Sequence, residues 1–395
     1  MNKVLAINSG SSSFKYKLFS LPNEEILAEG MADRVGMAES SFTMKLAKDK
    51  KYTKKVSIPD QEKAVGLLLE ALQEYNVVKD INEIVGVGHR IVAGGEYFKD
   101  SAIIDKNNLQ KIFELKEYAP LHNPVEGKVI EAFMKLLPGV PEVGVFDSSF
   151  HQTLDPVHYL YSVPYKWYEK YGARKYGAHG TSVRYVSQRA AKLIGKKIED
   201  LKLIVCHLGS GASVTAVKNG KSYDTSMGFS PLAGITMSSR SGDVDPSLIE
   251  FIMDKEHLSM KEMINILDNK SGLLGISELS PDMRDIRHSL DNPQAKLARD
   301  IFKNRLLRYV GAYLTEMGGA DAIIFTAGVG EHDKGVRKSL MEGLKIFGVL
   351  PDLKANEIGG ENTITKPESK IRVLVIPTDE ELMIERDVVR LAHLD

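Results

Sequence analysis

Short apolar runs alternate with longer segments of helical periodicity along most of the chain. Runs of strand length occupy residues 4–7, 84–87, 143–146, 203–206, 322–325 and 371–376. Apolar residues at helical spacing mark residues 62–75, 124–137, 181–194, 246–253, 294–317 and a last segment after 380. This alternation of strands and helices predicts an α/β fold.

One strand–turn–strand pattern occurs twice, as VLAINSGSSSFKYKLF at residues 4–19 and as LIVCHLGSGASVTAV at 203–217. In each copy the first strand ends in a polar residue and leads into a turn of glycine and serine. Placing Gly10 on Gly209 aligns the flanking strands without a gap. The repeat predicts two related domains.

Turns of this composition suit a phosphate group, because small residues let backbone N–H groups approach an anion closely and serine hydroxyls add donors. Either copy taken alone is equally typical of an ordinary hairpin. The shared pattern favours a nucleotide held between two related halves.

The length of 395 residues is enough for two cores, and no linker rich in proline or serine separates the halves. The repeat places the boundary near Phe150. We therefore expect an N-terminal domain at 1–150, joined by the C-terminal helix at about 380–395, and a C-terminal domain at 151–380.

Composition indicates small-molecule partners. The 52 Lys and Arg residues balance 53 Asp and Glu residues, which argues against a nucleic-acid-binding surface. No run approaches the roughly 18 apolar residues of a membrane helix, so no membrane partner is expected. The single cysteine, Cys206, excludes an internal disulfide and is expected to be buried, and the first residues lack a signal-peptide pattern. We expect a cytoplasmic protein.

Polar residues follow the apolar strands at six points, namely Asn8, Arg90, Asp147, His207, Glu331 and Glu380. Ligands of open α/β sheets bind at the carboxyl ends of the strands. A solvated loop charge or a helix cap is the alternative for each residue taken singly. The recurrence favours a binding site.

Two further residues stand out beside helix starts. Asp245 as N-cap, with Pro246 at the first helical position, explains the end of the loop SSRSGDVDPSL, but nothing local explains Arg240. Thr181 is predicted to be an N-cap, which leaves His179 in a glycine-flanked turn before a helix start, where anions are favoured.

Two arginines, a histidine, a carboxylate and phosphate-type turns fit the transfer of a phosphoryl group to an anionic acceptor. Two negative charges about 4 Å apart repel by roughly 1 kcal/mol in water and about 4 kcal/mol at a protein-like effective dielectric. Arginine and Mg²⁺ offset that repulsion. The sequence contains no Walker A pattern, no HRD or DFG set of protein kinases and no zinc-type Cys/His cluster.

Ordered motifs extend the comparison over nearly the whole chain. They are NSGSSSFKY, GHRIVAGGE, APLHNP, VFDSSFH, YGAHGTS, CHLGSGAS, TSMGFSPLAG, RSGDVDP, DMRDI, FTAGVGEH and PTDEELMIERD. In these motifs the chain resembles the acetate kinase family of the acetate and sugar kinase, Hsp70 and actin superfamily.

The resemblance implies two ribonuclease-H-like (actin-like ATPase) domains with a nucleotide cleft between them, and a homodimer formed through the C-terminal domain. It also implies reversible transfer of the ATP γ-phosphoryl group to acetate, directly and in line, giving acetyl phosphate and ADP. ATP and ADP are then co-substrates, and Mg²⁺, or Mn²⁺ in its place, is the cofactor.

Site roles follow from the same resemblance. Metal contacts are implied for Asn8 and Glu380, and contact with the acetate carboxylate for Arg90. Asp147 is implied as an acid/base or metal-orienting group, while His179 and Arg240 would stabilise the transferring phosphoryl group. An apolar methyl pocket is implied at Val92, Leu121 and Pro231. ATP contacts are implied for Lys15, His207, Leu208, Gly209, Ser210, Gly211, Asp282, Met283, Arg284, Gly328, Val329, Gly330, Glu331 and His332.

The chain departs from the family pattern at four positions. GHRVVHGG becomes GHRIVAGG with Ala93, GTSH becomes GTSV with Val183, CHLGNG becomes CHLGSG with Ser210, and GIGEN becomes GVGEH with His332. Ala93 and Val183 replace imidazoles near the acyl site, which predicts altered acid selectivity or pH dependence. Ser210 is shorter than asparagine, which predicts weaker nucleotide contact.

Two other functions compete with this interpretation. A propionate or butyrate kinase would keep every catalytic group and differ in pocket volume. A nucleotide-driven switch of the actin and Hsp70 type would hydrolyse ATP without an acyl acceptor. Two catalytic arginines are superfluous when water is the acceptor, which disfavours the switch.

Overall fold

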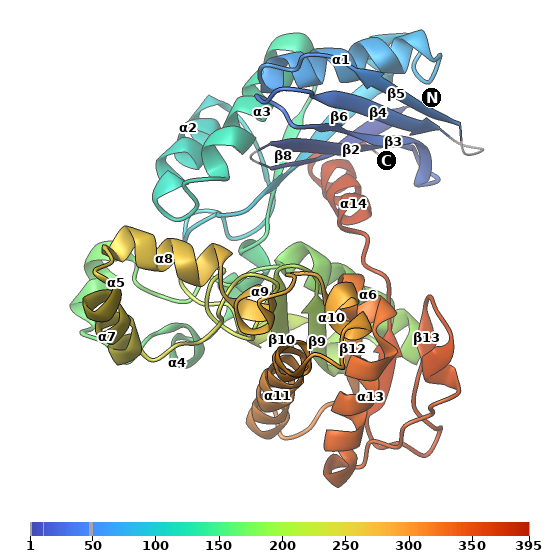
Figure 1. Cartoon of the computed structure of the whole chain (residues 1–395). Coiled ribbons are helices and arrows are strands. Elements are labelled where there is room, and N and C mark those ends of the chain that lie inside the picture. Colours follow the sequence, from blue (N-terminus) through green and yellow to red (C-terminus); the bar gives the residue numbers. More distant parts are fainter. Residues whose placement is uncertain (1, 11, 47–49, 395) are drawn as a thin grey trace. The chain divides into compact units, whose positions relative to one another are not determined.

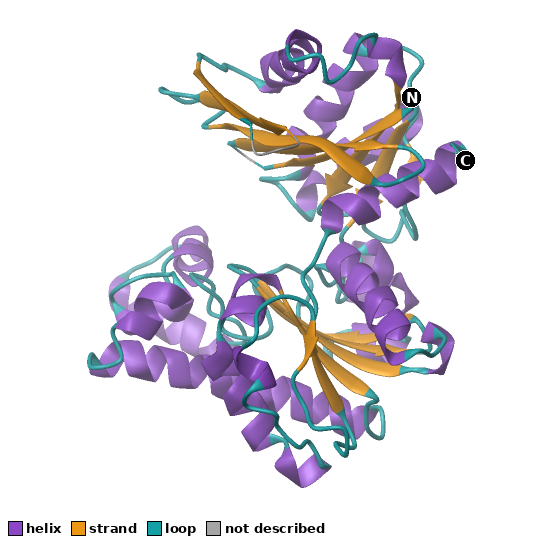
Figure 2. Cartoon of the chain, turned by 90° about the vertical axis from the view of Figure 1, so that its right-hand side faces the viewer, coloured by secondary structure: helices purple, strands orange, loops and turns teal. Residues whose placement is uncertain are grey.

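The chain divides into two compact units in the computed structural model, which describes residues 2–10, 12–46 and 50–394. Unit 1 comprises Met1–Phe150 and Asp379–Asp395, and unit 2 comprises His151–Thr378. No helix in these described ranges combines the length and apolar character needed to cross a bilayer. Each unit contains its own sheet with helices packed against it (Figures 1 and 2).

Unit 1 is built on a sheet with the strand order β5-β4-β3-β2-β1-β6-β8-β7. Its strands are β1 (Lys3–Ser9), β2 (Ser13–Ser20), β3 (Glu25–Asp33), β4 (Ser41–Leu46), β5 (Lys51–Lys55), β6 (Ile84–Ile91), β7 (Ala102–Ile103) and β8 (Glu142–Phe146). Its helices are α1 (Gln61–Glu74), α2 (Lys106–Glu114), α3 (Asn123–Leu136) and α14 (Glu380–Ala392).

Unit 2 is built on a sheet with the order β11-β10-β9-β12-β14-β13. Its strands are β9 (Lys202–Leu208), β10 (Ala212–Lys218), β11 (Lys221–Thr225), β12 (Ala322–Thr326), β13 (Asn362–Thr363) and β14 (Arg372–Val375). Its helices are α4 (Pro156–Tyr159), α5 (Lys166–Tyr171), α6 (Gly180–Ile194), α7 (Pro246–Glu256), α8 (Met260–Asn269), α9 (Gly272–Ser277), α10 (Met283–His288), α11 (Pro293–Glu316), α12 (Ala327–His332) and α13 (Lys334–Gly343).

The two sheets share one topology, which confirms the predicted α/β class and the predicted relation between the halves. In unit 1, β1 pairs antiparallel with β2 and parallel with β6, and β6 is parallel to β8. In unit 2, β9 pairs antiparallel with β10 and parallel with β12, and β12 is parallel to β14. The order β3-β2-β1-β6-β8 therefore corresponds to β11-β10-β9-β12-β14.

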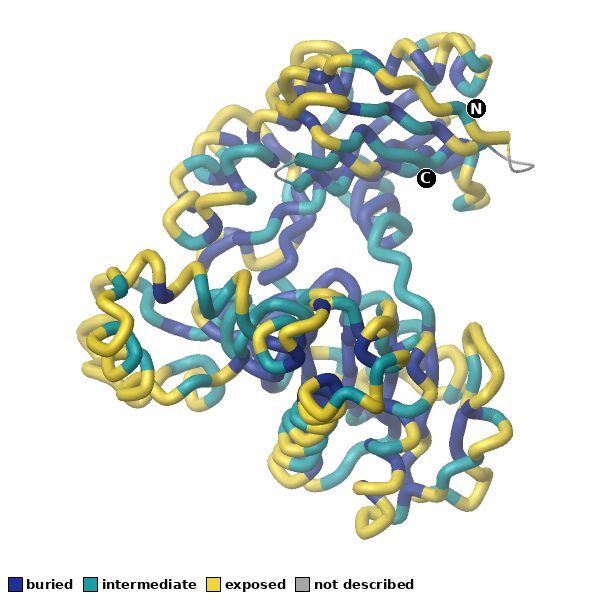
Figure 3. The backbone as a smooth tube through the Cα atoms, in the orientation of Figure 1, coloured by how far each residue is buried: buried dark blue, intermediate teal, exposed yellow. Residues whose placement is uncertain are grey.

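The central strand of unit 1 is buried on both faces, because successive side chains of a strand point to opposite sides. Leu5 and Ile7 join the apolar cluster formed with α1 and α3. Val4 and Ala6 join a second cluster with Ile384 of α14. The central strands accordingly appear as buried segments in Figure 3. A C-terminal helix thus completes the N-terminal unit.

The strands of the two hairpins begin at the positions that the alignment of Gly10 with Gly209 equates, but their pairing registers differ by one residue. Ser9 pairs with Phe14 in the first hairpin, whereas Leu208 pairs with Ala212 in the second. The first pair therefore encloses one more residue than the second. Side chains alternate between the two faces of a strand. Residues of β2 and β10 that are equivalent in the sequence alignment therefore point to opposite faces of their sheets.

Two predicted boundaries also differ in unit 2. The helix expected to begin after Thr181 begins at Gly180, and its N-cap is His179, whose left-handed φ of 41° turns the chain sharply into α6. The expected glycine-rich turn after β12 is the short helix α12, which closes when the Asp333 N–H donates to the Val329 carbonyl at 2.9 Å. Asp245 caps α7, as predicted.

Gly88 of β6 is required for the close packing of α14. An added Cβ would lie 2.7 Å from Val388 Cγ2 and closer still to Ile384 Cγ2. Gly88→Ala is therefore expected to lower the free energy of unfolding by about 1–3 kcal/mol. Gly66→Ala in α1 is the control, since its Cβ would meet open space and helix propensity predicts a gain of about 0.5–1 kcal/mol. Urea denaturation of both variants measures the difference; equal stabilities would contradict this packing.

Candidate functional site

Three polar residues of unit 1 converge on the guanidinium of Arg90 near the carboxyl ends of the parallel strands. Asn8 and Arg90 are the second-last residues of β1 and β6. Asp147 directly follows β8, and Glu380 is the first residue of α14. We call Asn8, Arg90, Asp147 and Glu380 the Arg90 cluster. All four were expected after strands of the predicted sheets, and the structure brings them together.

Hydrogen bonds hold the Arg90 side chain from two sides. Its Nε and Nη2 donate to Asp147 Oδ2 at 3.0 and 2.5 Å, and its Nη1 donates to Asn8 Oδ1 at 3.2 Å. Glu380 Oε2 lies 3.9 Å from Arg90 Nε. The Asp147 side chain is 2% exposed, whereas that of Arg90 is 22% exposed. The buried Asp147 and the half-buried Asn8 orient the guanidinium, and the Arg90 side chain as a whole is partly exposed.

Burial and charge act in opposite directions within this cluster. Burial raises the pKa of Glu380 to about 7, and Arg90 opposes that rise. Burial acts to lower the pKa of Arg90, but the charges of Asp147 and Glu380 outweigh it and raise that pKa. Lys15, the register partner of Asn8 on β2, also favours ionised Glu380. The neighbouring cations therefore determine how many carboxyl groups of the cluster are ionised.

Glu126 is a member of this neighbourhood that sequence reasoning missed. Its side chain is buried on α3, and its Oε2 accepts a hydrogen bond from the Val92 N–H at 3.1 Å. Burial raises its pKa to about 8, against the opposing charge of Arg90. A charged residue at helical spacing from the apolar Val129, Ile130 and Phe133 was the signal that could have found it.

The three residues predicted to form the methyl pocket belong to different units. Val92 and Leu121 lie in unit 1, where Val92 is half-buried and Leu121 is 66% exposed. Pro231 lies in unit 2 and is half-buried. Their joint role stays a prediction.

Two histidines stack beside the hairpin turn of unit 2. The His179 and His207 rings lie 4.1 Å apart between centroids, with their planes 13° apart. His179 Nδ1 is 2.9 Å from Ser213 Oγ, and His207 Nδ1 is 2.8 Å from Ser182 Oγ. A serine hydroxyl thus orients each imidazole, and neither serine was expected from the sequence to contact a histidine.

Arg240 approaches the same turn. An added Cβ on Gly211 would lie 3.3 Å from both Arg240 Nη1 and His179 Nε2. Arg240 is oriented by an ion pair of 3.0 Å with Asp268 and by donation to the Pro231 carbonyl at 3.4 Å. The absence of a side chain at Gly211 therefore leaves space beside the turn for the Arg240 guanidinium and the His179 imidazole.

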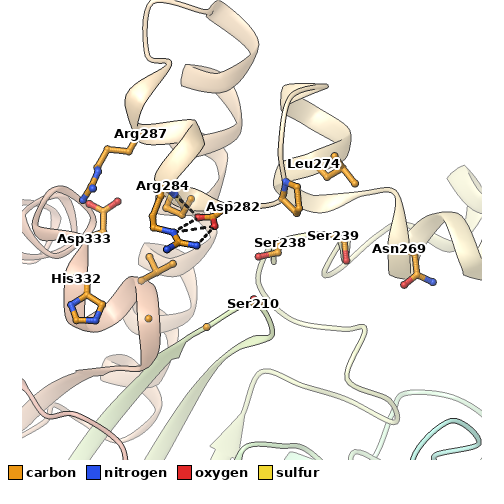
Figure 4. A pocket seen from close by; sticks show the side chains of 15 residues that line it. Ser210, Ser238, Ser239, Asn269, Leu274, Asp282, Arg284, Arg287, His332 and Asp333 are labelled. Carbon is orange, nitrogen blue, oxygen red and sulfur yellow. Dashed lines mark hydrogen bonds and ion pairs between the residues drawn. The ribbon is translucent and has the colours of Figure 1, made fainter. Parts of the chain in front are cut away.

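A pocket of about 860 Å³ in unit 2 begins at this turn (Figure 4). Its lining includes eight of the predicted nucleotide residues: Gly209, Ser210, Asp282, Met283, Arg284, Gly328, Val329 and His332. Lining residues that sequence reasoning did not single out include Ser238, Ser239, Asn269 and Arg287. The volume suits a ligand of nucleotide size.

Other predicted nucleotide residues lie outside the lining of this pocket. Leu208 and Gly330 are buried, and Glu331 Oε1 accepts from the Thr378 N–H at 3.4 Å. His207 lies in β9, where it pairs with Ser213, and Gly211 is the last residue of the turn. Lys15 belongs to unit 1, and Ser11 of the first turn lies outside the described residues.

Asp282 and Arg284 form a charged edge of the pocket. Asp282 caps α10 by accepting from the Arg284 N–H at 2.8 Å, and it also pairs with the Arg284 guanidinium (Figure 4). The hydrogen bond from that guanidinium lowers the pKa of Asp282 to about 2. Arg284 is 79% exposed, so its charge faces solvent at the edge of the pocket.

Known proteins match this chain over nearly its whole length. The acetokinase family model matches residues 3–386. The chain belongs to the acetokinase family. It is 55% identical over 394 residues to an acetate kinase of Limosilactobacillus fermentum, covering 99% of each chain, and 50% identical over 395 residues to one of Bacillus subtilis, covering 99% of this chain and all of the relative.

Solved structures agree with this assignment. Porphyromonas gingivalis acetate kinase matches with a TM-score of 0.95 and 41% identity, and a Francisella tularensis propionate kinase with 0.93 and 37%. Each match covers 99% of this chain and 100% of the other. The fold is therefore the two-domain, actin-like ATPase fold expected from the sequence.

Removal of the central guanidinium tests the electrostatics of unit 1. Arg90→Met is expected to lower the free energy of unfolding by about 2–4 kcal/mol near pH 8, because it removes the cation that pairs with the buried Asp147 and lies beside Glu380. The pKa of Glu380 then rises further, so the loss shrinks as the pH falls toward about 5 and the carboxyl takes up a proton.

Arg189→Met is the matched control, since it breaks an exposed ion pair with Glu361 whose arginine is 43% exposed. Its cost is expected to stay below about 1 kcal/mol. Urea unfolding at both pH values measures each variant. A pH-independent loss in Arg90→Met would contradict the proposed charge balance.

Proposed function

We propose that this protein catalyses reversible transfer of the ATP γ-phosphoryl group to acetate, giving acetyl phosphate and ADP. The observation that carries the proposal is the Arg90 cluster, in which the buried Asp147 and the half-buried Asn8 orient a partly exposed arginine. The curated relatives that are 50–55% identical over the full chain bear the name acetate kinase, which supports the same activity.

Unit 1 would supply the acceptor site. The Arg90 side chain is partly exposed and would bind the acetate carboxylate, while Asp147 fixes the guanidinium and would act as an acid/base or metal-orienting carboxylate. Val92 and Leu121, with Pro231 of unit 2, would contact the methyl group. Positioning of this kind supplies catalysis without covalent chemistry.

Unit 2 would supply the nucleotide site. The 860 Å³ pocket would hold the nucleotide, and the turn from His207 to Gly211 would place its phosphate tail. His179 and Arg240 would stabilise the oxygens of the transferring group, because charge spreads over those oxygens in the transition state. Lys15 would add a cation from unit 1.

Oxygen ligands in unit 1 fit a hard dication. Asn8 offers a carbonyl oxygen, and Glu380 offers a carboxylate with a pKa raised by burial to about 7, which a nearby dication would keep ionised. Asn8 and Glu380 would therefore hold Mg²⁺, or Mn²⁺ in its place. The metal would neutralise charge on the phosphates of the nucleotide.

No protein nucleophile is required. Cys206 is fully buried in β9, and burial raises the pKa of its thiol far from the reactive range. A phosphoryl group would pass directly and in line from the nucleotide to the acceptor.

Propionate is the second candidate acceptor. A propionate kinase with a TM-score of 0.93 shares the full-length fold, and Ala93 places a small residue after Val92. Discrimination over one methylene is worth about 1–3 kcal/mol, so we expect measurable activity with propionate and less with butyrate.

A homodimer in the cytoplasm completes the proposal. Several segments of unit 2 expose apolar side chains, among them Tyr165, Trp167 and Tyr171 in one segment and Phe251 and Met260 in another. Such residues are typical of protein interfaces. They would form the contact between subunits.

A hydroxylamine trap for acyl phosphate tests the activity. We expect hydroxamate from ATP and acetate with Mg²⁺, a smaller yield with propionate, and none without a carboxylic acid. ATP loss without hydroxamate would instead support a nucleotide switch.

Arg240→Ala tests the donor side. Turnover is expected to fall by about 10²–10³-fold or more, because one preorganised cation for the transferring group is lost. Arg189→Ala, which removes an exposed arginine, should retain wild-type turnover. Near-normal hydroxamate formation in Arg240→Ala would refute its assigned role.

A further inference from the structure

Glu126 has an unusual environment for a carboxyl group. Its side chain is 1% exposed, and its Oε1 has no hydrogen-bond partner among the described residues. Its Oε2 accepts from the Val92 N–H, a backbone donor of the proposed acceptor pocket. A buried carboxylate with one unpaired oxygen is costly, whereas a neutral carboxylic acid keeps the Val92 bond and carries its proton on the unpaired oxygen.

The charged groups that act on Glu126 belong to the catalytic neighbourhood. Arg90 on β6 favours its ionised form, and Asp147 after β8 disfavours it. α3 packs against its neighbouring helices through apolar side chains of its own: Val129 and Phe133 join the cluster with α1, and Ile130 joins the cluster with α2. Within the described residues, those helices place no lysine or arginine against the Glu126 carboxyl group.

Ionisation of Glu126 would weaken the attraction between Arg90 and an anionic acceptor. Arg90 already faces the carboxyls of Asp147 and Glu380. An ionised Glu126 would add another negative charge near the guanidinium that must attract an anionic acceptor. Repulsion between like charges at short range weakens the binding of that anion.

We propose that Glu126 is a positioning residue of the acceptor site that holds a proton while the carboxylate substrate binds. It fixes the Val92 backbone and leaves the attraction of Arg90 available to the acceptor. This inference rests on the proposed kinase function and assigns to that function a pH-sensitive control of acceptor affinity.

The direction of the pH effect follows from burial. The pKa of Glu126 lies at about 8, so the group is mostly neutral below that pH and ionises above it. The KM for acetate should therefore rise by about fivefold to tenfold as the pH increases from about 7 to about 9.5. The KM for ATP should not follow that rise, because the nucleotide pocket lies in unit 2.

Glu126→Gln provides the test, since the amide is neutral at every pH. The variant should lose the alkaline rise in the KM for acetate, so that its KM is the same near pH 7 and near pH 9.5. Glu385→Gln is the matched control: Glu385 is also 1% exposed with a pKa raised by burial to about 7, but its charged neighbours are Glu24 and Arg386. This control should keep the wild-type profile.

The outcomes separate this inference from the proposed function. An active wild type whose KM for acetate stays constant up to about pH 9.5 would overturn the inference even if Glu126→Gln failed to fold. An alkaline rise that persists in folded Glu126→Gln would also overturn it. Absence of hydroxamate at every pH in the wild type would instead refute the kinase function.

A stability readout does not depend on activity. Because the folded state raises the pKa of Glu126, the wild type should lose stability relative to Glu126→Gln as the pH rises from about 5 to about 8. Thermal unfolding of both proteins across this range measures the change. A constant difference would contradict a proton held by Glu126.

Discussion

The ion pair between Arg90 and the buried Asp147 is the interaction on which the rest of unit 1 depends. Asp147 is nearly inaccessible, so the guanidinium must remain beside it, and that requirement fixes the orientation of Arg90. Segments from both ends of the chain then meet at the same point, because Asn8 comes from β1 and Glu380 from α14. Gly88 lets α14 pack closely on β6 and thereby brings Glu380 into range.

The same topology has different consequences in the two units. In unit 1 the strand ends carry an arginine surrounded by carboxyl groups. In unit 2 the corresponding hairpin carries His207, which stacks on His179, and its turn opens into a pocket. The turn between β9 and β10 ends at Gly211, where the missing side chain leaves space beside His179 and Arg240. Unit 1 thus places an arginine among carboxyl groups, and unit 2 places cationic groups beside a pocket.

Local patterns were sufficient to predict most elements. Apolar runs identified β1, β6, β8, β9, β12 and β14, and helical spacing identified α1, α3, α6 and α11. Polar residues at strand ends pointed to Arg90 and Asp147, which the structure brings into contact. These features depend on neighbours in sequence or on the common direction of parallel strands.

Features set by tertiary contact were not predicted. Glu126 reaches Val92 across 34 positions of sequence, and no local pattern reports such a pairing. The left-handed backbone of His179 makes α6 begin at Gly180 and not after Thr181. The register of the second hairpin depends on the pairing of Leu208 with Ala212. Long-range packing decides these details, so one sequence alone does not specify them.

The central claim is that charge and positioning carry the reaction without a covalent step on the protein. The most direct measurement uses ATP whose γ-phosphoryl group is made chiral with oxygen isotopes, followed by configurational analysis of the acetyl phosphate. Direct in-line transfer predicts inversion at phosphorus. Retention of configuration would require an intermediate on the protein and would contradict the account.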